Sequence, residues 1–260
     1  MLLPDNFLGS GSQKFARKIT FHNQAFALIA TDPHHFYPPL SDMSYRGIQN
    51  LIYLQNFPQV TPIVGFCITR RKILVLQPVG VSLLEYIGSP TYSRVTITQR
   101  IRLVKSFLSV FEFLHKSPIG SLVNCDFHNK NKTLSQFLVI DGRVVINDLD
   151  RAYSVSDGYK INCKLQDLSG IDKKFVSPEE LLSLNDESIS SVNQKADIFK
   201  IPTLIETILY TNLANPKGLN IIMPELHSMG SEFLNPVPEL RPDIDELVKV
   251  YSRMLSFFRE

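Results

Sequence analysis

Residues near the start of the chain have the types and spacing of a loop that binds phosphate. In residues 8–15, LGSGSQKF, Gly9 and Gly11 lie two positions apart, and Lys14 stands three positions after Gly11. Glycine lets backbone amides approach a phosphate closely, and an ammonium group binds phosphate oxygens. The alternative is an exposed lysine beside a glycine turn, because a G-x-G pair alone is a weak signal.

Metal-binding patterns made of cysteine or histidine are not found in this sequence. A thiolate zinc site usually needs a C-x-x-C pair, and the histidines lack the spacing of metal ligands. The residues concerned are Cys67, Cys125, Cys163, His34, His35, His115 and His128. One disulfide with a free thiol and three reduced thiols both fit this cysteine count.

The composition is that of an ordinary globular protein that can bury a substantial core. The chain has 260 residues, of which 44% are hydrophobic and 20% charged, and its formal net charge is +2. A nearly neutral charge predicts no nucleic-acid partner and no binding to an anionic membrane surface. No run approaches 18 apolar residues, and MLLPDNF is too short and polar for a signal peptide. We therefore expect neither a membrane span nor an export signal in this chain, which can still be the lumenal part of a longer protein.

The elements that must position the glycine loop are mostly strands. Residues 7–30 read as strands that alternate or run apolar around the polar turn HNQ, and the proline-rich loop TDPHHFYPPL follows. Residues 41–57 have apolar side chains at helical spacing. Two further strands, VTPIVGFCIT and KILVLQ, complete a small part that is mostly sheet with one helix.

After Pro78 and Gly80 the chain becomes mainly helical. The stretch TITQRIRLVKSFLSVFEFLHKS carries a wide apolar face. Two short strands, QFLVIDG and RVVIND, are joined by a tight turn at Asp141-Gly142. Helices resume in PEELLSL, KADIFKIPTLIETILY and DIDELVKVYSRMLSFF. This order predicts an α+β protein with two lobes: an N-lobe at about 1–77, a hinge at about 77–81 and a C-lobe at about 82–260.

Seven motifs, in the right order, resemble those of the protein kinase superfamily. They are LGSGSQKF for the glycine-rich loop, ILVLQPVGVSLLEYI for the last strand and hinge, FEFLHKSPIGSLVNCD for the catalytic loop, VINDLD for the metal-binding segment, FVSPEEL, KADIF and ELRPDIDELV. The resemblance implies an α+β bilobal protein-kinase-like fold. It also places Leu8, Gly9, Gly11 and Ala27 in the nucleotide-binding set.

The departures from the kinase pattern are informative. The strand lysine is replaced by Ile29, and no glutamate precedes Glu85, so its usual helix partner is missing too. H-R-D has become Asn124-Cys125-Asp126, and D-F-G has become Asp148-Leu149-Asp150. These departures, with SPIGSLVNCD, KTLSQFL and ADIFKIP, are similar to the protein O-mannose kinase family. In with-no-lysine kinases the ATP-holding lysine moves into the glycine-rich loop, which is where Lys14 stands.

The resemblance assigns the chemistry of phosphoryl transfer residue by residue. Asp126 matches the catalytic base, and Lys14 is the lysine that holds the ATP phosphates. Asp148 is expected to hold Mg²⁺, and Gln136 matches the second metal ligand. Asp150 stands at a glycine position and receives no metal, being either a supporting group or a polar residue without a catalytic role. Lys132 is a weaker candidate for contact with the transferred phosphate.

The resemblance also implies two structural pairs. The catalytic loop and the activation segment are neighbours in a kinase fold, so Cys125 and Cys163 are either disulfide-bonded or two buried thiols. Glu179 and Arg241 match the buried ion pair that braces the C-lobe.

The family implies an ATP- and magnesium-dependent kinase that phosphorylates the 6-hydroxyl of a protein-linked O-mannose. Its acceptor would be a core glycan of dystroglycan-like glycoproteins. Family members are anchored in the endoplasmic reticulum membrane and face the lumen, through an anchor that this sequence does not show. Two alternatives remain: a catalytically silent pseudokinase that acts as a binding or scaffold module, and a kinase that acts on protein hydroxyls.

Overall fold

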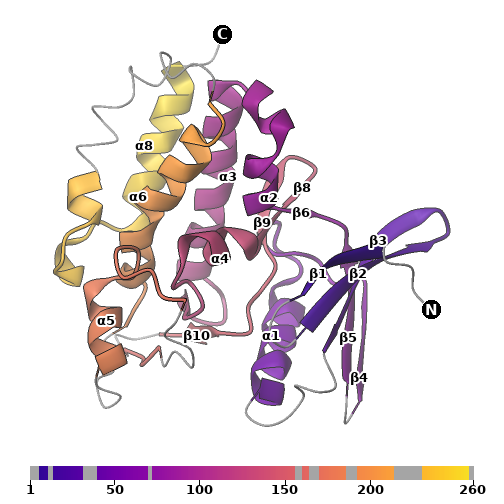
Figure 1. The fold of residues 1–260 in the computed structure, drawn as a ribbon. Coiled ribbons are helices and arrows are strands. Elements are labelled where there is room, and N and C mark those ends of the chain that lie inside the picture. The colour runs from indigo at the N-terminus through magenta and orange to yellow at the C-terminus, as the bar shows by residue number, and fades with distance from the viewer. Residues whose placement is uncertain are drawn as a thin grey trace.

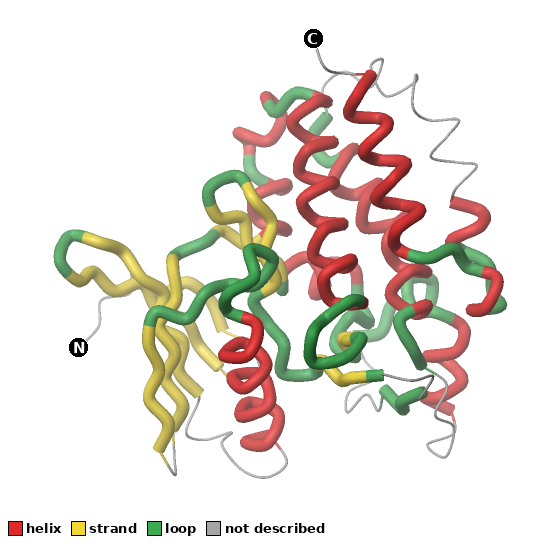
Figure 2. The backbone as a smooth tube through the Cα atoms, turned by 180° about the vertical axis from the view of Figure 1, so that it is seen from behind, coloured by secondary structure: helices red, strands yellow, loops and turns green. Residues whose placement is uncertain are grey.

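The computed structural model describes residues 6–10, 14–31, 40–69, 72–155, 160–163, 170–185, 192–213 and 230–257. It divides into a small part rich in strands and a larger part rich in helices (Figures 1 and 2). This arrangement confirms the α+β bilobal fold that the motif order predicts. The exact lobe boundary at residues 77–81 stays a prediction.

The small lobe is a five-stranded antiparallel sheet with the strand order β1-β2-β3-β5-β4. Its strands are β1 (Phe7–Ser10), β2 (Lys14–Phe21), β3 (Gln24–Thr31), β4 (Gly65–Thr69) and β5 (Lys72–Pro78). The turn between β2 and β3 uses His22 and Asn23 at positive φ, which is what a tight antiparallel hairpin requires. The sequence predicted a longer strand before β5, but residues 60–64 lie outside it, and Val60 instead bridges to Ile146 of the large lobe.

One helix, α1 (Leu40–Leu54), packs on this sheet (Figure 1). Ile48 on its buried face packs with Ile73 and Val75 of β5. Beyond the helix, the backbone of Gln59 and Thr61 forms hydrogen bonds with Ile146 at 2.8 and 2.9 Å. The helix therefore packs on the sheet, and the residues that follow it are hydrogen-bonded to β9 of the large lobe.

Among the described residues, the large lobe contains six labelled helices and five short strands. The helices are α2 (Leu83–Gly88), α3 (Ile97–His115), α4 (Lys130–Ser135), α5 (Pro178–Asn185), α6 (Lys195–Tyr210) and α8 (Ile244–Phe257). The strands are β6 (Val81–Ser82), β7 (Leu122–Asn124), β8 (Phe137–Ile140), β9 (Arg143–Ile146) and β10 (Ala152–Ser154). Two short 3₁₀ helices, Pro90–Arg94 and Pro238–Leu240, complete the described elements.

Helix α3 forms the centre of the large lobe and contacts α6, α8 and β9 (Figure 1). A capping box fixes its start, because Thr96 and Gln99 satisfy each other's backbone amides. Its apolar face, which includes Phe107 and Phe111, is fully buried against Phe127 and Phe137. The core therefore reaches the base of the loop that follows β7, where Asp126 stands.

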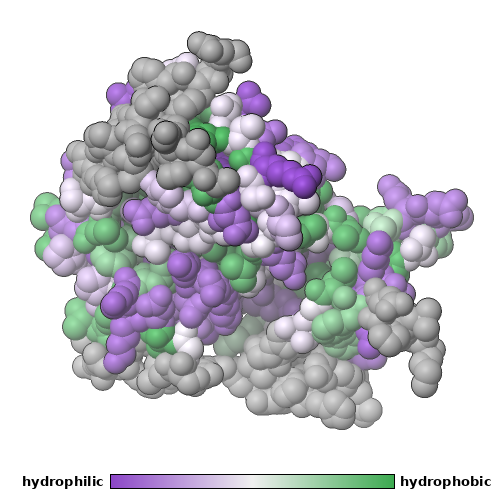
Figure 3. Space-filling view, turned by 45° about the horizontal axis from the view of Figure 1, so that its top comes forward, coloured by the Kyte–Doolittle hydropathy of each residue, from purple (hydrophilic) through white to green (hydrophobic). Residues whose placement is uncertain are grey.

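The β8–β9 hairpin forms as predicted around Asp141-Gly142, with both residues at positive φ. Hydrophilic and hydrophobic side chains are interspersed on the face shown in Figure 3. Within the described residues, the helices are too short or too polar to cross a lipid bilayer.

Candidate active site

Lys14 is the first residue of β2, and its side chain reaches across to the large lobe. Its Nζ lies 2.5 Å from both carboxylate oxygens of Asp150, which follows β9 in the chain. The Lys14 side chain is 24% exposed and that of Asp150 is 14% exposed. Lys14 therefore points toward Asp150 of the large lobe. The alternative of an exposed surface lysine would require the side chain to point into bulk water.

The charges around this pair keep Lys14 protonated. Burial lowers the pKa of Lys14, but the negative charges of Asp150, Asp148 and Asp126 outweigh burial and raise the pKa above its ordinary value. Burial and the neighbouring charge of Asp148 raise the pKa of Asp150 to about 7, against the opposing effect of Lys14. One cation thus stands close to three acidic side chains.

Helix α1 makes room for this pair. A Cβ at Gly47 would lie 1.8 Å from Oδ1 of Asp150, so no larger side chain fits there while Asp150 keeps its position. Asn50, one turn further on, donates to the carbonyl of Leu149 at 3.2 Å and lies 3.5 Å from the carbonyl of Ala152. The sequence reasoning missed both residues, although a glycine in the middle of a helix is a signal, since it costs about 1 kcal/mol relative to alanine.

Asp126 lies in the loop between β7 and α4, at the position predicted for the catalytic base. Its Oδ2 accepts a hydrogen bond from Gln136 Nε2 at 2.6 Å, and its Oδ1 accepts one from Lys132 Nζ at 2.7 Å. Arg151 and His128 lie further away, at 3.7 and 3.8 Å from Oδ1. The carboxylate is thus held from both sides, and the Lys132 contact supports the predicted place of that lysine beside the reacting groups.

A closed set of hydrogen bonds orients this carboxylate. The backbone amide of Asp126 donates to Asn124 Oδ1 at 2.9 Å, and Asn124 Nδ2 donates to Gln136 Oε1 at 3.3 Å and to the carbonyl of Asp148 at 3.1 Å. Because Gln136 must direct its NH₂ at the carboxylate, its oxygen faces Asn124. Gln136 therefore positions Asp126 in this structure, and its role as a metal ligand stays a prediction.

Asp148 follows β9, and its charge, like that of Asp126, acts on Lys14 and Asp150. Its Oδ1 accepts a hydrogen bond from the backbone amide of Asp150 at 3.1 Å. No cluster of three His, Cys, Asp or Glu residues suited to a metal ion occurs in the described part of the chain. Magnesium needs no such cluster, because it binds through one or two carboxylates together with phosphate oxygens and water. The carboxylate of Asp148 fits that requirement.

Two paired residues of the sheet are candidates for contact with a nucleotide base. Ala27 of β3 is buried and pairs in register with Gln77 of β5. Gln77 is 1% exposed, and both polar atoms of its amide lack a hydrogen-bond partner among the described residues. A buried amide without partners is costly, and an adenine edge offers both a donor and an acceptor. Ile29 occupies the usual position of the lysine on β3, opposite Ala16.

The glycine-rich loop is described in part. Leu8 and Gly9 belong to β1, and Gly9 has φ of +154°, which residues with side chains rarely adopt. A Cβ at Gly9 would meet nothing within 4 Å, so the backbone conformation and not lack of space requires glycine. Leu8 is 39% exposed at the edge of the sheet. Gly11 lies outside the described residues.

The structure joins Cys125 and Cys163 by a disulfide, which decides between the two alternatives that the sequence left open. Cys125 is the residue before Asp126, so the bond ties the loop that holds Asp126 to the segment that contains Cys163. Both cysteines are buried in a small cluster with Val123, Val155 and Val192. Cys67 is a free, exposed thiol on β4.

Buried ion pairs support the large lobe. Arg241 donates to both carboxylate oxygens of Glu179 at 2.6 and 2.8 Å, which confirms the predicted pair. A second pair, between Lys200 Nζ and Glu180 Oε1 at 2.6 Å, was not predicted. Its partners are separated by 20 positions on two different helices, and no local pattern connects them.

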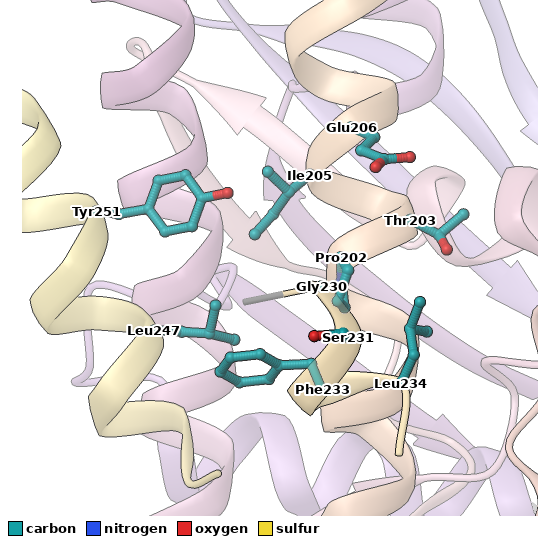
Figure 4. A pocket seen from close by; sticks show the side chains of 10 residues that line it. All are labelled: Pro202, Thr203, Ile205, Glu206, Gly230, Ser231, Phe233, Leu234, Leu247 and Tyr251. Atoms are coloured by element: carbon teal, nitrogen blue, oxygen red, sulfur yellow. The ribbon is translucent and has the colours of Figure 1, made fainter. Parts of the chain in front are cut away.

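A cavity of about 200 Å³ lies between α6, α8 and residues 230–234 (Figure 4). Its lining includes Ile205, Phe233, Leu247 and Tyr251 and is mostly apolar. None of the residues predicted for phosphoryl transfer lines it, so it is separate from the candidate site.

Comparisons with known proteins give one consistent result. No family model matches the sequence. The chain is 31% identical over 231 residues to the protein O-mannose kinase of Xenopus laevis, and the match covers 84% of this chain and 63% of that protein. It is 29% identical to the human and chicken proteins of the same name, over 234 and 232 residues, with 85% and 84% of this chain and 65% and 64% of those proteins covered. The chain thus spans a little less than two thirds of the length of the curated relatives that it matches.

Proposed function

We propose that this chain, which is similar to protein O-mannose kinases, is a member of that family and a kinase that phosphorylates a mannose linked to a protein hydroxyl. The phosphate donor is ATP and the metal is Mg²⁺. The acceptor is the 6-hydroxyl of the mannose in a core glycan of the type carried by dystroglycan. The observation that carries the proposal is the Lys14–Asp150 contact, because it turns the relocated lysine toward the carboxylates of the site.

Each residue of the site has a definite task in this proposal. When bound, ATP with Mg²⁺ supplies the γ-phosphoryl group and neutralises part of its charge. Lys14 binds phosphate oxygens, and Gly9 lets the backbone of β1 approach them. Asp148 offers a carboxylate to the metal. The amide of Gln77 and the small side chain of Ala27 accommodate the base.

Asp126 handles the proton of the attacking hydroxyl. Gln136 donates a hydrogen bond to Oδ2 of Asp126, so the proposed base atom is Oδ1. This oxygen also accepts a hydrogen bond from Lys132. As the sugar oxygen bonds to the γ-phosphorus, the bond from that phosphorus to the β–γ bridging oxygen breaks and ADP leaves, while the hydroxyl proton moves to Asp126 Oδ1. The side chain of Lys132 is half-exposed, which leaves it free to move to the charge that develops on the transferred group.

The disulfide supports the proposed location. A bond between Cys125 and Cys163 persists in oxidising compartments, such as the lumen of the endoplasmic reticulum. We propose that the chain works there on glycoprotein acceptors.

The alternative is a pseudokinase that binds partners without transfer. The observation that favours it is the amide oxygen of Gln136, which already accepts a hydrogen bond from Asn124 at 3.3 Å. The two proposals differ in what they predict for transfer and for binding of nucleotide.

A transfer assay separates them. The protein is incubated with magnesium and γ-labelled ATP, with either an O-mannosyl glycopeptide or the same peptide without sugar. We expect label on the sugar alone, lost in Lys14→Ala and Asp126→Asn and kept in Asp141→Asn, a matched change in the exposed turn of the β8–β9 hairpin. An acceptor that lacks the 6-hydroxyl should remain unlabelled.

Other outcomes favour the other functions. Label on the peptide without sugar indicates a kinase for protein hydroxyls. No label on either substrate, with no stabilisation by ATP, indicates the pseudokinase.

A further inference from the structure

We propose that Asp150 is the positioning residue of Lys14, and that Gly47 of α1 leaves the space that the Asp150 carboxylate needs for this role. The inference deepens the proposed function and rests on it. It assigns a role to the residue after Asp148-Leu149, where a glycine is usual, and to a helix glycine with no role in the sequence pattern.

The first support is the geometry of the pair. Lys14 belongs to the small lobe and Asp150 to the large lobe, and they are 136 positions apart in the chain. Both carboxylate oxygens of Asp150 lie 2.5 Å from Nζ. A lysine side chain on a strand has four rotatable bonds, so without a fixed partner it samples many positions. The two-oxygen contact restricts it to one.

The second support is the space at Gly47. Oδ1 of Asp150, which also contacts Lys14, lies 1.8 Å from the place of a Cβ on residue 47, and the Asp150 Cα lies 3.0 Å from it. A helix that carried a glutamate here would exclude Asp150 from its position. The carboxylate that holds the lysine therefore comes from either the helix or the Asp148–Asp150 segment, and this chain uses the segment.

The third support is the attachment of α1 to the same segment. Asn50 binds the carbonyl of Leu149, the residue between the two aspartates. Helix, segment and lysine thus form one connected unit. In this unit α1 acts on Lys14 indirectly: Gly47 leaves space for Asp150, and Asn50 holds the backbone of Leu149. No charged side chain of the helix is needed.

The test is a double-mutant cycle read by binding of a fluorescent ATP analogue without acceptor. Asp150→Asn keeps the size of the side chain and removes its charge, so we expect nucleotide affinity to fall about tenfold or more. In the Lys14→Ala background the same change should alter affinity by less than about twofold, because residues that act as a pair are not additive. The matched control, Asp243→Asn, removes a carboxylate that contacts Lys195 at 2.5 Å on the large lobe and should leave affinity unchanged.

Three results would overturn the inference. They are unchanged affinity in Asp150→Asn, an equal loss in both backgrounds, or a lower melting temperature with normal affinity of the folded protein. If the wild-type protein itself binds no nucleotide, the proposed function fails, and this inference fails with it.

Gly47→Ala is an independent second variant, because it leaves Lys14 and Asp150 chemically unchanged. Its new methyl group displaces the Asp150 carboxylate, so we expect weaker nucleotide binding although alanine favours the helix. In an Asp150→Gly background the same change should have little further effect. Wild-type affinity in the single Gly47→Ala variant would contradict the role given to this glycine.

Discussion

The side-chain amide of Gln136 donates to Oδ2 of Asp126 across 2.6 Å, while its own oxygen accepts from Asn124. This contact engages Oδ2 of the predicted base, whereas Oδ1 contacts the more exposed Lys132. It also identifies Gln136 as a residue that orients the base, whether or not it later contacts a metal.

Gln136→Glu should reduce transfer strongly. The new carboxylate would face Asp126 at hydrogen-bond distance, and two like charges at that distance disfavour each other's ionised form. We expect the transfer rate to fall about 10²-fold, as is typical when a general base is disabled. The matched control is Gln99→Glu in the capping box of α3, where glutamate is equally suitable. A Gln136→Glu enzyme with a normal rate would show that the contact has no role in orienting the base.

Lys132→Ala should separate transfer from nucleotide binding. Lys132 contacts Asp126 Oδ1 but is 46% exposed and lies on α4, whereas Lys14 lies on the sheet. We expect the transfer rate to fall about tenfold, the size of one charged contact in a transition state, with nucleotide affinity unchanged. Lys130→Ala, in the same helix, serves as the control. A rise in the nucleotide dissociation constant without loss of rate would place Lys132 in the nucleotide site instead.

Much of this architecture was predictable because it depends on local patterns. Strand alternation, the helical spacing around α1 and the turn at Asp141-Gly142 are encoded by neighbouring residues. The order of the motifs then indicated the fold and the Glu179–Arg241 pair, whereas the role of Lys14 in holding ATP stays a prediction.

The remaining features depend on distant residues that meet only in the folded chain. Asp150 gained a partner 136 positions away, and the space that it occupies was made by Gly47 on another element. The hydrogen bond between Asn124 and Gln136 could not be predicted from the sequence either. Each side-chain amide can donate and accept, and the fold decides which neighbours it meets. A glycine within a helix and an aspartate at a glycine position were separate signals, and only the structure connects them.

Loss of the disulfide should destabilise the protein. Cys125 and Cys163 are 38 positions apart, and a cross-link over a loop of that size contributes about 2–4 kcal/mol by restricting the unfolded chain. A Cys125→Ser, Cys163→Ser variant should therefore unfold at lower denaturant concentration than the wild type, and reductant should shift every protein that keeps the bond but not this double variant. Cys67→Ser is the control, since that thiol is free and exposed. Equal unfolding midpoints for all three proteins would contradict the bond.

Breaking the Glu179–Arg241 pair should be more costly than breaking an exposed pair. Both partners are buried, and Glu179→Gln leaves the Arg241 guanidinium without its carboxylate. We expect a loss of about 3–5 kcal/mol in the free energy of unfolding. Glu239→Gln disrupts the exposed contact with Lys160 and should change stability by less than about 1 kcal/mol. Similar values for the two variants, from denaturant titration, would show that the buried pair does not brace the lobe.

The most direct test of the whole account is the affinity of Lys14→Ala for ATP, measured by calorimetry in the presence of magnesium. Lys18→Ala is the matched control, because Lys18 is an exposed lysine of the same strand. The account predicts a loss of about tenfold or more for Lys14→Ala, the size expected for a charged hydrogen bond to phosphate, and wild-type affinity for Lys18→Ala. Equal, undiminished affinity in both variants would show that β2 does not supply the phosphate-binding cation, and the proposed kinase mechanism would be wrong.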